Sequence, residues 1–169
     1  MSARAPRHAT TGLPGLDAVL HGIEPGDNIV WEVDDIADYQ ELVAPYAGAA
    51  LAAQRHLVYF RFADHPPLLS EGANGEEFRF DPSLGFESFV RGVHDVIERA
   101  GRGAIYVFDC LSYLADTWGS DQSLGNFFAL MCPRLFDLDT VTYFGLYRDR
   151  HSAYALDPIR LTTQFMLDV

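Results

Sequence analysis

The sequence of 169 residues contains no lysine, and all 12 of its basic residues are arginines. Asp and Glu together number 24, so the formal net charge is −12. The arginines are scattered singly, whereas phosphate backbones and anionic membrane surfaces are bound by clustered basic side chains. We therefore expect neither nucleic acid nor a membrane surface as a partner.

Long apolar runs and metal-binding cysteine patterns are also missing. No run of about 18 apolar residues occurs, so no transmembrane span is expected. The first residues lack the apolar stretch of a secretory signal. Cys110 and Cys132 stand outside any CxxC or Cys/His spacing, so a zinc site has no support. Two thiols in apolar surroundings favour a cytoplasmic protein with reduced, buried cysteines.

What the chain has in quantity is hydrophobic surface. Hydrophobic residues make up 49% and aromatic residues 13%, which is typical of a globular domain with a large core. Nine aromatic residues are expected to fill that core: Tyr39, Tyr46, Tyr59, Phe60, Phe127, Phe128, Phe136, Tyr143 and Phe144. Such an excess also suits a buried protein interface, where aromatics are favoured.

Apolar runs alternate with helical patterns along the chain. Strands are expected at 28–33, 57–62, 77–80, 104–109, 140–146 and 161–169. A turn leading into a short amphipathic helix is expected at 12–20. Longer helices are expected at 36–54, 84–100 and 124–136, with Pro133 kinking or ending the last one. This alternation predicts a layered α/β domain with a mostly parallel sheet. We expect a flexible leader over 1–11 and one domain over 12–169. Because the last strand runs into the C-terminus, we expect the domain to be a piece of a longer protein.

Three segments carry a family resemblance. Segment 11–17 reads TGLPGLD and is followed by Gly22 and by Pro25-Gly26; strand 105–109 ends in Asp109 before Leu111-Ser112; strand 57–62 leads to Asp64. Together they resemble the RecA/KaiC-like branch of P-loop ATPases, with Asp109 and Ser112 in a Walker B-like position. Within that branch the chain resembles the N-terminal domain of some phosphoenolpyruvate-synthase-like or pyruvate-phosphate-dikinase-like proteins. The resemblance implies a three-layer RecA-like fold.

The segment after the first strand departs from that family. A P-loop uses glycines, a lysine and a Ser/Thr to hold phosphates and Mg²⁺. Here Asp34, Asp35 and Asp38 occupy the region instead. Asp35 is expected to cap the following helix, with Asp38 completing a capping box; the alternative is a divalent-cation site formed by the three aspartates. The resemblance therefore implies a degenerate phosphate loop.

Other polar residues follow the remaining strands. Asp109 is expected to bond the next turn, through Ser112, or to face a ligand, because crevices beyond strand ends bind ligands in open α/β sheets. Asp64 and His65 suit acid–base chemistry or a solvated loop. Arg148, Arg150 and His151 form a loop that reaches an anion or a neighbouring subunit, as arginine fingers do, or stays solvated.

The leading hypothesis is a non-catalytic binding or assembly module that self-associates or binds a protein partner, with no metal or cofactor. The alternative is an atypical nucleotide- or phosphometabolite-binding regulatory domain of a phosphotransfer enzyme. It would bind ATP and Mg²⁺ and would need Arg61, Arg148 or Arg150 to supply positive charge. A third hypothesis is a hydrolase built on Asp64, His65 and Asp109, although no GxSxG motif surrounds any serine.

Overall fold

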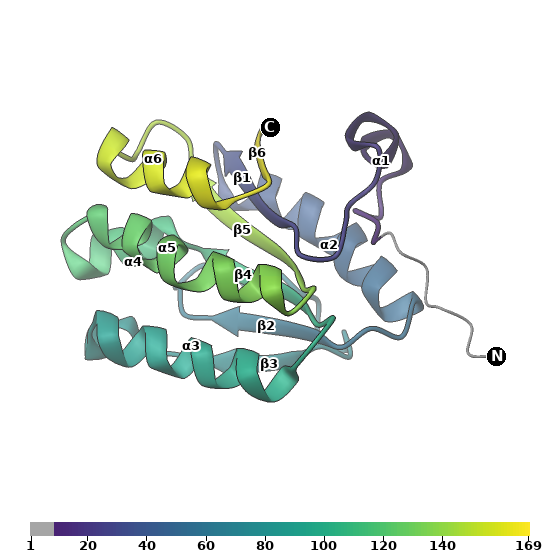
Figure 1. The fold of residues 1–169 in the computed structure, drawn as a ribbon, viewed down its shortest axis with the longest axis horizontal. Helices are drawn as coiled ribbons and strands as arrows, with labels where there is room; N and C mark the ends of the chain where they lie inside the picture. The colour runs from purple at the N-terminus through teal and green to yellow at the C-terminus, as the bar shows by residue number, and fades with distance from the viewer. Residues whose placement is uncertain (1–8) are drawn as a thin grey trace.

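The computed structural model of the chain describes residues 9–169. Over this range the chain forms six strands and six α-helices (Figure 1). The strands are β1 (Asn28–Val33), β2 (Leu57–Arg61), β3 (Glu76–Arg79), β4 (Ile105–Cys110), β5 (Val141–Tyr147) and β6 (Phe165–Asp168). The helices are α1 (Pro14–Leu20), α2 (Ile36–Ala52), α3 (Phe86–Ala100), α4 (Ser112–Trp118), α5 (Gln122–Asp137) and α6 (Ala153–Thr162), with a 3₁₀ turn, η1 (Pro82–Leu84).

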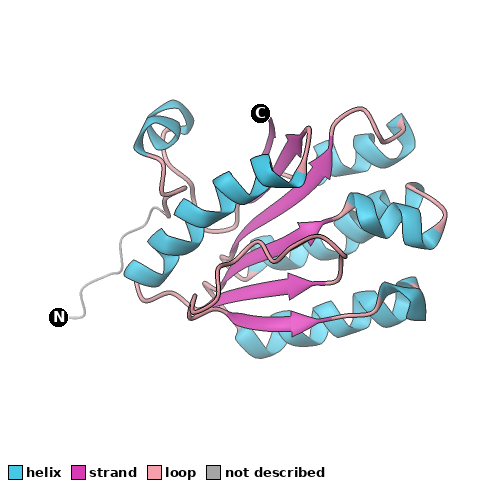
Figure 2. Cartoon of the chain, turned by 180° about the vertical axis from the view of Figure 1, so that it is seen from behind, coloured by secondary structure: helices cyan, strands magenta, loops and turns pink. Residues whose placement is uncertain are grey.

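The six strands of residues 9–169 form one parallel sheet in the order β3-β2-β4-β5-β1-β6. Helix α2 covers one face, and α3, α5 and α6 lie side by side on the other (Figures 1 and 2). The central strands are buried on both faces, as all six residues of β4 are, because helices cover both sides. The expected fold class, a three-layer α/β domain with a mostly parallel central sheet, is confirmed.

Two hydrophobic cores separate the layers. The core on the α2 side contains Tyr39, Tyr46 and Tyr143, and the rings of Tyr46 and Tyr143 stack 3.7 Å apart. The opposite core, under α3 and α5, is rich in phenylalanine. Of the nine aromatics expected inside, eight are buried, whereas Phe136 is 53% exposed at the end of α5.

The structure differs from the expectations in three places. Pro133 does not end α5, which continues to Asp137, four residues further, because its buried side chains hold it against the core despite the missing N–H. Helix α4 was not expected. The strand expected at 161–169 is only Phe165–Asp168, and the segment before it is α6. Proline at 158 and the highly exposed Tyr154 and Leu161 hide the helical pattern of α6.

The expected leader over 1–11 lies largely outside the described residues, and its last three residues belong to the fold. Ala9 pairs with Ile23, its N–H donating to the Ile23 carbonyl at 2.9 Å. Thr11 is fully buried, and both its N–H and its hydroxyl donate to the Asp17 carboxylate at 2.8 Å. Residues 9–11 therefore anchor α1.

The connections diverge at the carboxyl edge of the sheet. β1 leads to α2 on one face, while its neighbour β5 leads to α6 on the other. β2 leads to a loop whose Leu68 packs in the α2-side core, while its neighbour β4 leads to α4 and α5 on the opposite face. Such divergence opens crevices where ligands bind in open α/β sheets. The fold therefore directs attention to two places, one beyond β2 and β4 and one beyond β1, β5 and β6.

Candidate functional site

The predicted site residues gather along the carboxyl edge of the sheet. Those after β2 and β4 form one group, around Asp109, and those after β1 and β5 form another, around Arg148. We refer to these as the Asp109 group and the Arg148 group. The first group contains Asp109 and His65, with Asp64 beside it. The second contains Arg148, His151, Asp34 and Asp35, together with the residues that line the adjoining cavity, Glu32, Arg160 and Asp168. Ser112 follows β4, but its hydroxyl lies against His151 of the second group.

Asp109 is fully buried, and its carboxylate is enclosed by donors from its neighbour strand. The N–H groups of Phe62 and Ala63 donate to Oδ2 at 2.8 and 2.9 Å, and the Tyr59 hydroxyl donates to Oδ1. The Tyr59 hydroxyl also accepts the N–H of Leu68 at 3.1 Å. Burial, followed by the charge of Asp109, raises the pKa of Tyr59 well above its ordinary value. Asp109 thus ties β4 to β2 and to the loop that follows it.

His65 closes this group from the outside. Its side chain is only 10% exposed, so it is not the solvated loop residue that the sequence allowed. Nε2 accepts the N–H of Cys110 at 3.2 Å, and Nδ1 lies 2.8 Å from the Pro66 carbonyl. This pattern suits a neutral ring with its proton on Nδ1. Because Nε2 already accepts a backbone N–H, its lone pair is not directed at solvent.

Asp64 and Arg61 lie outside this enclosed cluster. Asp64 is exposed and accepts the Tyr113 hydroxyl at 3.1 Å. Arg61 forms a long ion pair with Glu77, at 3.9 Å. The structure therefore brings His65 to Asp109 but gives Asp64 a separate partner, and the three residues do not surround a common open space.

Ser112 does not bond Asp109, contrary to one expectation. Its hydroxyl oxygen lies 2.7 Å from Nε2 of His151 and accepts the N–H of Tyr147 at 2.9 Å. Burial lowers the pKa of His151, whereas the charges of Asp121 and Asp116 oppose that shift. Nδ1 of His151 is buried and has no hydrogen-bond partner in the described part of the chain. A serine–histidine pair is present, but the carboxylate that orients the ring in a catalytic triad is not bonded to it.

The start of α2 is capped from within. The Asp35 carboxylate accepts the N–H groups of Ala37 and Asp38 at 2.7 and 3.2 Å, as the sequence predicted. Asp38 makes no return bond within residues 9–169, so only half of the capping box forms. Tyr39, in the first turn, crosses the sheet above Gly145, and its hydroxyl donates to the Phe108 carbonyl at 3.0 Å. A carboxylate and a tyrosine ring therefore occupy the start of the helix that follows β1.

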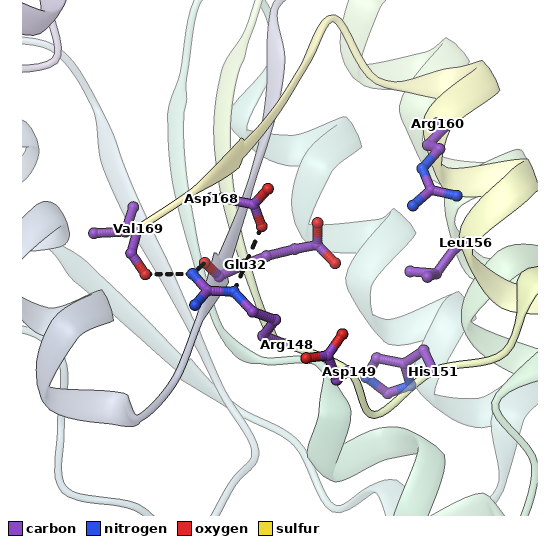
Figure 3. A pocket seen from close by; sticks show the side chains of 8 residues that line it. All are labelled: Glu32, Arg148, Asp149, His151, Leu156, Arg160, Asp168 and Val169. Atoms are coloured by element: carbon purple, nitrogen blue, oxygen red, sulfur yellow. Dashed lines mark hydrogen bonds and ion pairs between the residues drawn. The ribbon is translucent and has the colours of Figure 1, made fainter.

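Arg148 links the ends of three strands. Its guanidinium pairs with Asp34 at 3.0 Å. It also pairs with Asp168 at 3.6 Å and donates to the Val169 carbonyl (Figure 3). Arg150 instead lies over the ring of Tyr147, 5.0 Å from its centroid. The loop expected to reach an anion thus has its first arginine occupied by carboxylates of the same chain.

Two cavities flank this loop and share His151. The larger, about 540 Å³, lies beyond β1, β5 and β6 and is lined by Glu32, Asp149, Arg160 and Asp168 as well as by Arg148 and His151 (Figure 3). The other, about 490 Å³, is lined by Ser112, Asp116, Asp121 and Arg150 among others. Both volumes are within the range of small-molecule sites.

The part of the chain that the structure describes contains no group of side chains arranged to bind a metal ion. Across residues 9–169, no three His, Cys, Asp or Glu side chains converge on a common point that could hold an ion, so the alternative cation site at Asp34, Asp35 and Asp38 is not formed. Cys110 and Cys132 are free and buried, as expected. None of the helices described here combines the length and hydropathy that crossing a bilayer requires.

Four residues of these groups were not identified from the sequence: Tyr39, Tyr59, Glu32 and Arg160. The tyrosines were assigned only to the core, and no motif marks the two charged residues. Glu32 gave the one usable signal, because a carboxylate inside an otherwise apolar strand is uncommon in a sheet covered on both faces.

Comparison with known proteins does not extend this picture. A scan against models of protein families finds no match for the chain, and a search of curated proteins finds none either.

Proposed function

We propose that this chain is a non-catalytic binding or assembly module, related to RecA/KaiC-like domains, that has lost the phosphate-binding loop. The observation that carries the proposal is the capped start of α2. In a working P-loop the free N–H groups at this helix end face the nucleotide. Here Asp35 accepts two of them, so the chain's own carboxylate takes the place of the phosphate.

Charge supports the same conclusion. Asp34, Asp35 and Asp38 surround the helix start, and the nearest arginine, Arg148, is already paired with Asp34 and Asp168. A triphosphate entering this region would meet carboxylates at short range before it met an available cation. Asp109, the Walker B-like residue, is enclosed by Tyr59, Phe62 and Ala63 and has no face open to Mg²⁺ or its water shell.

The exposed side of α6 supports assembly. The exposed fractions of Tyr154 and Leu161 are 80% and 86%. Tyr154 and Leu161 are seven residues apart and therefore share one side of the helix. Exposed large apolar side chains that gather on one face mark interaction surfaces.

We commit to a second copy of the chain as the occupant of this surface. In a two-fold arrangement of α6 against α6, Tyr154 of one copy can pack against Leu161 of the other, which makes the surface complementary to itself. A different protein as the occupant is an alternative outcome of the test below.

The nucleotide part is tested by thermal unfolding with ATP or ADP, each with and without Mg²⁺. A site filled at a hundred times its dissociation constant adds about 2.7 kcal/mol of stability, or about 5–10 °C for a chain of this size. We expect no such shift beyond a salt-matched control. A clear ATP shift that disappears in Arg148→Ala would contradict the proposal and favour the nucleotide- or phosphometabolite-binding regulatory domain.

The assembly part is tested by size-exclusion chromatography with light scattering. We expect a dimer that dissociates in the double variant Tyr154→Ser/Leu161→Asp. Leu84→Asp is the matched control, because Leu84 is also highly exposed, at 71%, but belongs to η1. A strict monomer at high concentration, or equal effects of both variants, would contradict self-association through α6.

A further inference from the structure

The cavity of about 540 Å³ in Figure 3, which we call the strand-end cavity, has no part in the assembly function proposed above. Its walls come from three strand ends, the loop after β5, and α6. Glu32 and Asp168 stand on one side, and Arg160 points into the cavity from α6 on the other. Opposite charges therefore face each other across an open space.

The acidic wall is unusual in its pairing. Glu32 and Asp168 are register partners on neighbouring parallel strands, so their side chains extend on the same face of the sheet. Like charges placed opposite each other on adjacent strands destabilise a sheet. Arg148 offsets Asp168 at 3.6 Å. Burial, followed by the charge of Asp168, raises the pKa of Glu32, and Arg160 and Arg148 lower it in part.

The guanidinium of Arg160, on the other wall, has N–H donors that are available to a ligand. Arg160 pairs with Asp157 through Nη1 at 3.6 Å, a separation too long for a strong hydrogen bond. A guanidinium carries five N–H donors in a planar fork that matches a carboxylate. The side chain of Arg160 is 54% exposed, and its head group is directed toward the cavity (Figure 3). It is therefore available to an incoming anionic group.

The overall charge of the cavity selects among ligand classes. Two arginines, Arg148 and Arg160, line it together with three carboxylates, Glu32, Asp149 and Asp168. A phosphate dianion would be repelled at short range by the three carboxylates. A simple amine would be repelled by the two arginines. A ligand with one charge of each sign, held apart by a short carbon frame, would be attracted by both walls.

We propose that the strand-end cavity binds a small zwitterion of the amino-acid type. The ligand's carboxylate accepts from the Arg160 guanidinium, and its ammonium group donates to Glu32 and Asp168. Leu156 of α6 also lines the cavity and provides an apolar surface for the ligand's side chain. The cavity volume matches that of a small-molecule site. This site is separate from the exposed face of Tyr154 and Leu161, so it does not rest on the assembly proposal.

The experiment uses the full chain and measures thermal shifts and titration calorimetry with the proteinogenic amino acids, each at up to about 10 mM. Matched probes are the corresponding amines without the carboxylate, the corresponding acids without the ammonium group, and inorganic phosphate. We expect at least one amino acid to bind at least about tenfold more tightly than its amine and acid analogues. Phosphate is expected to give no shift beyond its salt effect.

Three variants test the two walls. Arg160→Gln and Glu32→Gln are each expected to weaken the amino acid at least about tenfold, whereas Asp157→Asn, which touches Arg160 from outside the cavity lining, is expected to stay within about threefold. No binding by any amino acid, equal binding by an amine or acid alone, or phosphate binding in their place would each overturn the proposal. Light scattering on the same variants keeps this result separate from assembly, because an unchanged mass is expected in all three.

Discussion

The two groups at the carboxyl edge of the sheet use carboxylates in opposite ways. Asp109 is fully buried and receives three donors from Tyr59, Phe62 and Ala63. On the other side Glu32 is half-buried and Asp168 is exposed, and both face a cavity across which Arg160 stands. A carboxylate enclosed by the chain's own donors is part of the fold, whereas charges that face a cavity add little to stability and are available to a ligand. The predictions below test this difference.

The largest effect is expected for Asp109→Ala. This change leaves the Tyr59 hydroxyl and two backbone N–H groups buried without an acceptor, which costs about 3–5 kcal/mol. Asp168→Ala is the matched change in the other group. It removes one partly exposed pairing with Arg148, and we expect it to cost less than about 1 kcal/mol. Urea unfolding, read as a change in midpoint at constant slope, measures both.

Equal losses of stability in Asp109→Ala and Asp168→Ala would contradict this difference between the groups, because they would mean that the Arg148 group also holds the fold together. A further check is the conservative change Asp109→Asn. It keeps an acceptor for the N–H groups of Phe62 and Ala63 and should recover part of the loss.

A smaller but still large effect is expected for Gly145→Ala in β5. A Cβ placed there would lie 2.7 Å from the ring of Tyr39, the residue that closes the space between α2 and the sheet. Overpacking of this kind costs about 1–3 kcal/mol. Gly48→Ala in α2 is the control, because a Cβ at Gly48 meets nothing within 4 Å, and it should stabilise the helix by about 0.5–1 kcal/mol. If both changes behaved alike in thermal unfolding, Tyr39 would not be packed as described.

The sheet could be predicted from the sequence because its strands are continuous apolar runs. The strand at 28–33 is found at those residues, and β4 differs by one residue at each end. Helices α4 and α6 could not be predicted. The first has only seven residues, and the second contains Pro158 and places Tyr154 and Leu161 in solvent, which removes the periodic signal.

Most residues of the site could be identified from the sequence, but their hydrogen-bond partners could not. Asp109 was recognised at its strand end, yet its partner Tyr59 lies 50 residues away in the chain. In the sequence Ser112 was associated with Asp109 and His151 with Arg148, yet the two residues meet across 39 residues of chain. Both contacts depend on the strand order, which places β4 between β2 and β5. Only the capping by Asp35 was predicted with its geometry, because it is local.

Removal of the Asp35 cap is expected to cost about 1 kcal/mol, because the N–H groups of Ala37 and Asp38 lose their acceptor. Asp34→Ala is the neighbouring control. Asp34 is exposed and pairs with Arg148, so its loss should be about 0.5 kcal/mol or less. Asp35→Ala has a second use, since it also frees the helix start. If this variant gained an ATP-dependent thermal shift that the wild type lacks, the self-capping argument for lost phosphate binding would become sharper.

The smallest effect expected concerns His151, which joins the two cavities. Burial lowers its pKa below the ordinary value of 6.5. Because the folded chain resists protonation of this ring, the unfolded chain binds more protons once the pH falls below about 6.5. The stabilisation from His151 is therefore complete above that pH and is lost as the pH falls toward the folded pKa. Solvent screening of this partly exposed ring limits the loss to less than about 1 kcal/mol.

In His151→Gln, which can still bond Ser112, the stability difference from the wild type should shrink between about pH 7.5 and pH 5.5, as followed by urea unfolding. A difference that stays constant over this range would show that the contact between Ser112 and His151 does not depend on the charge of the ring.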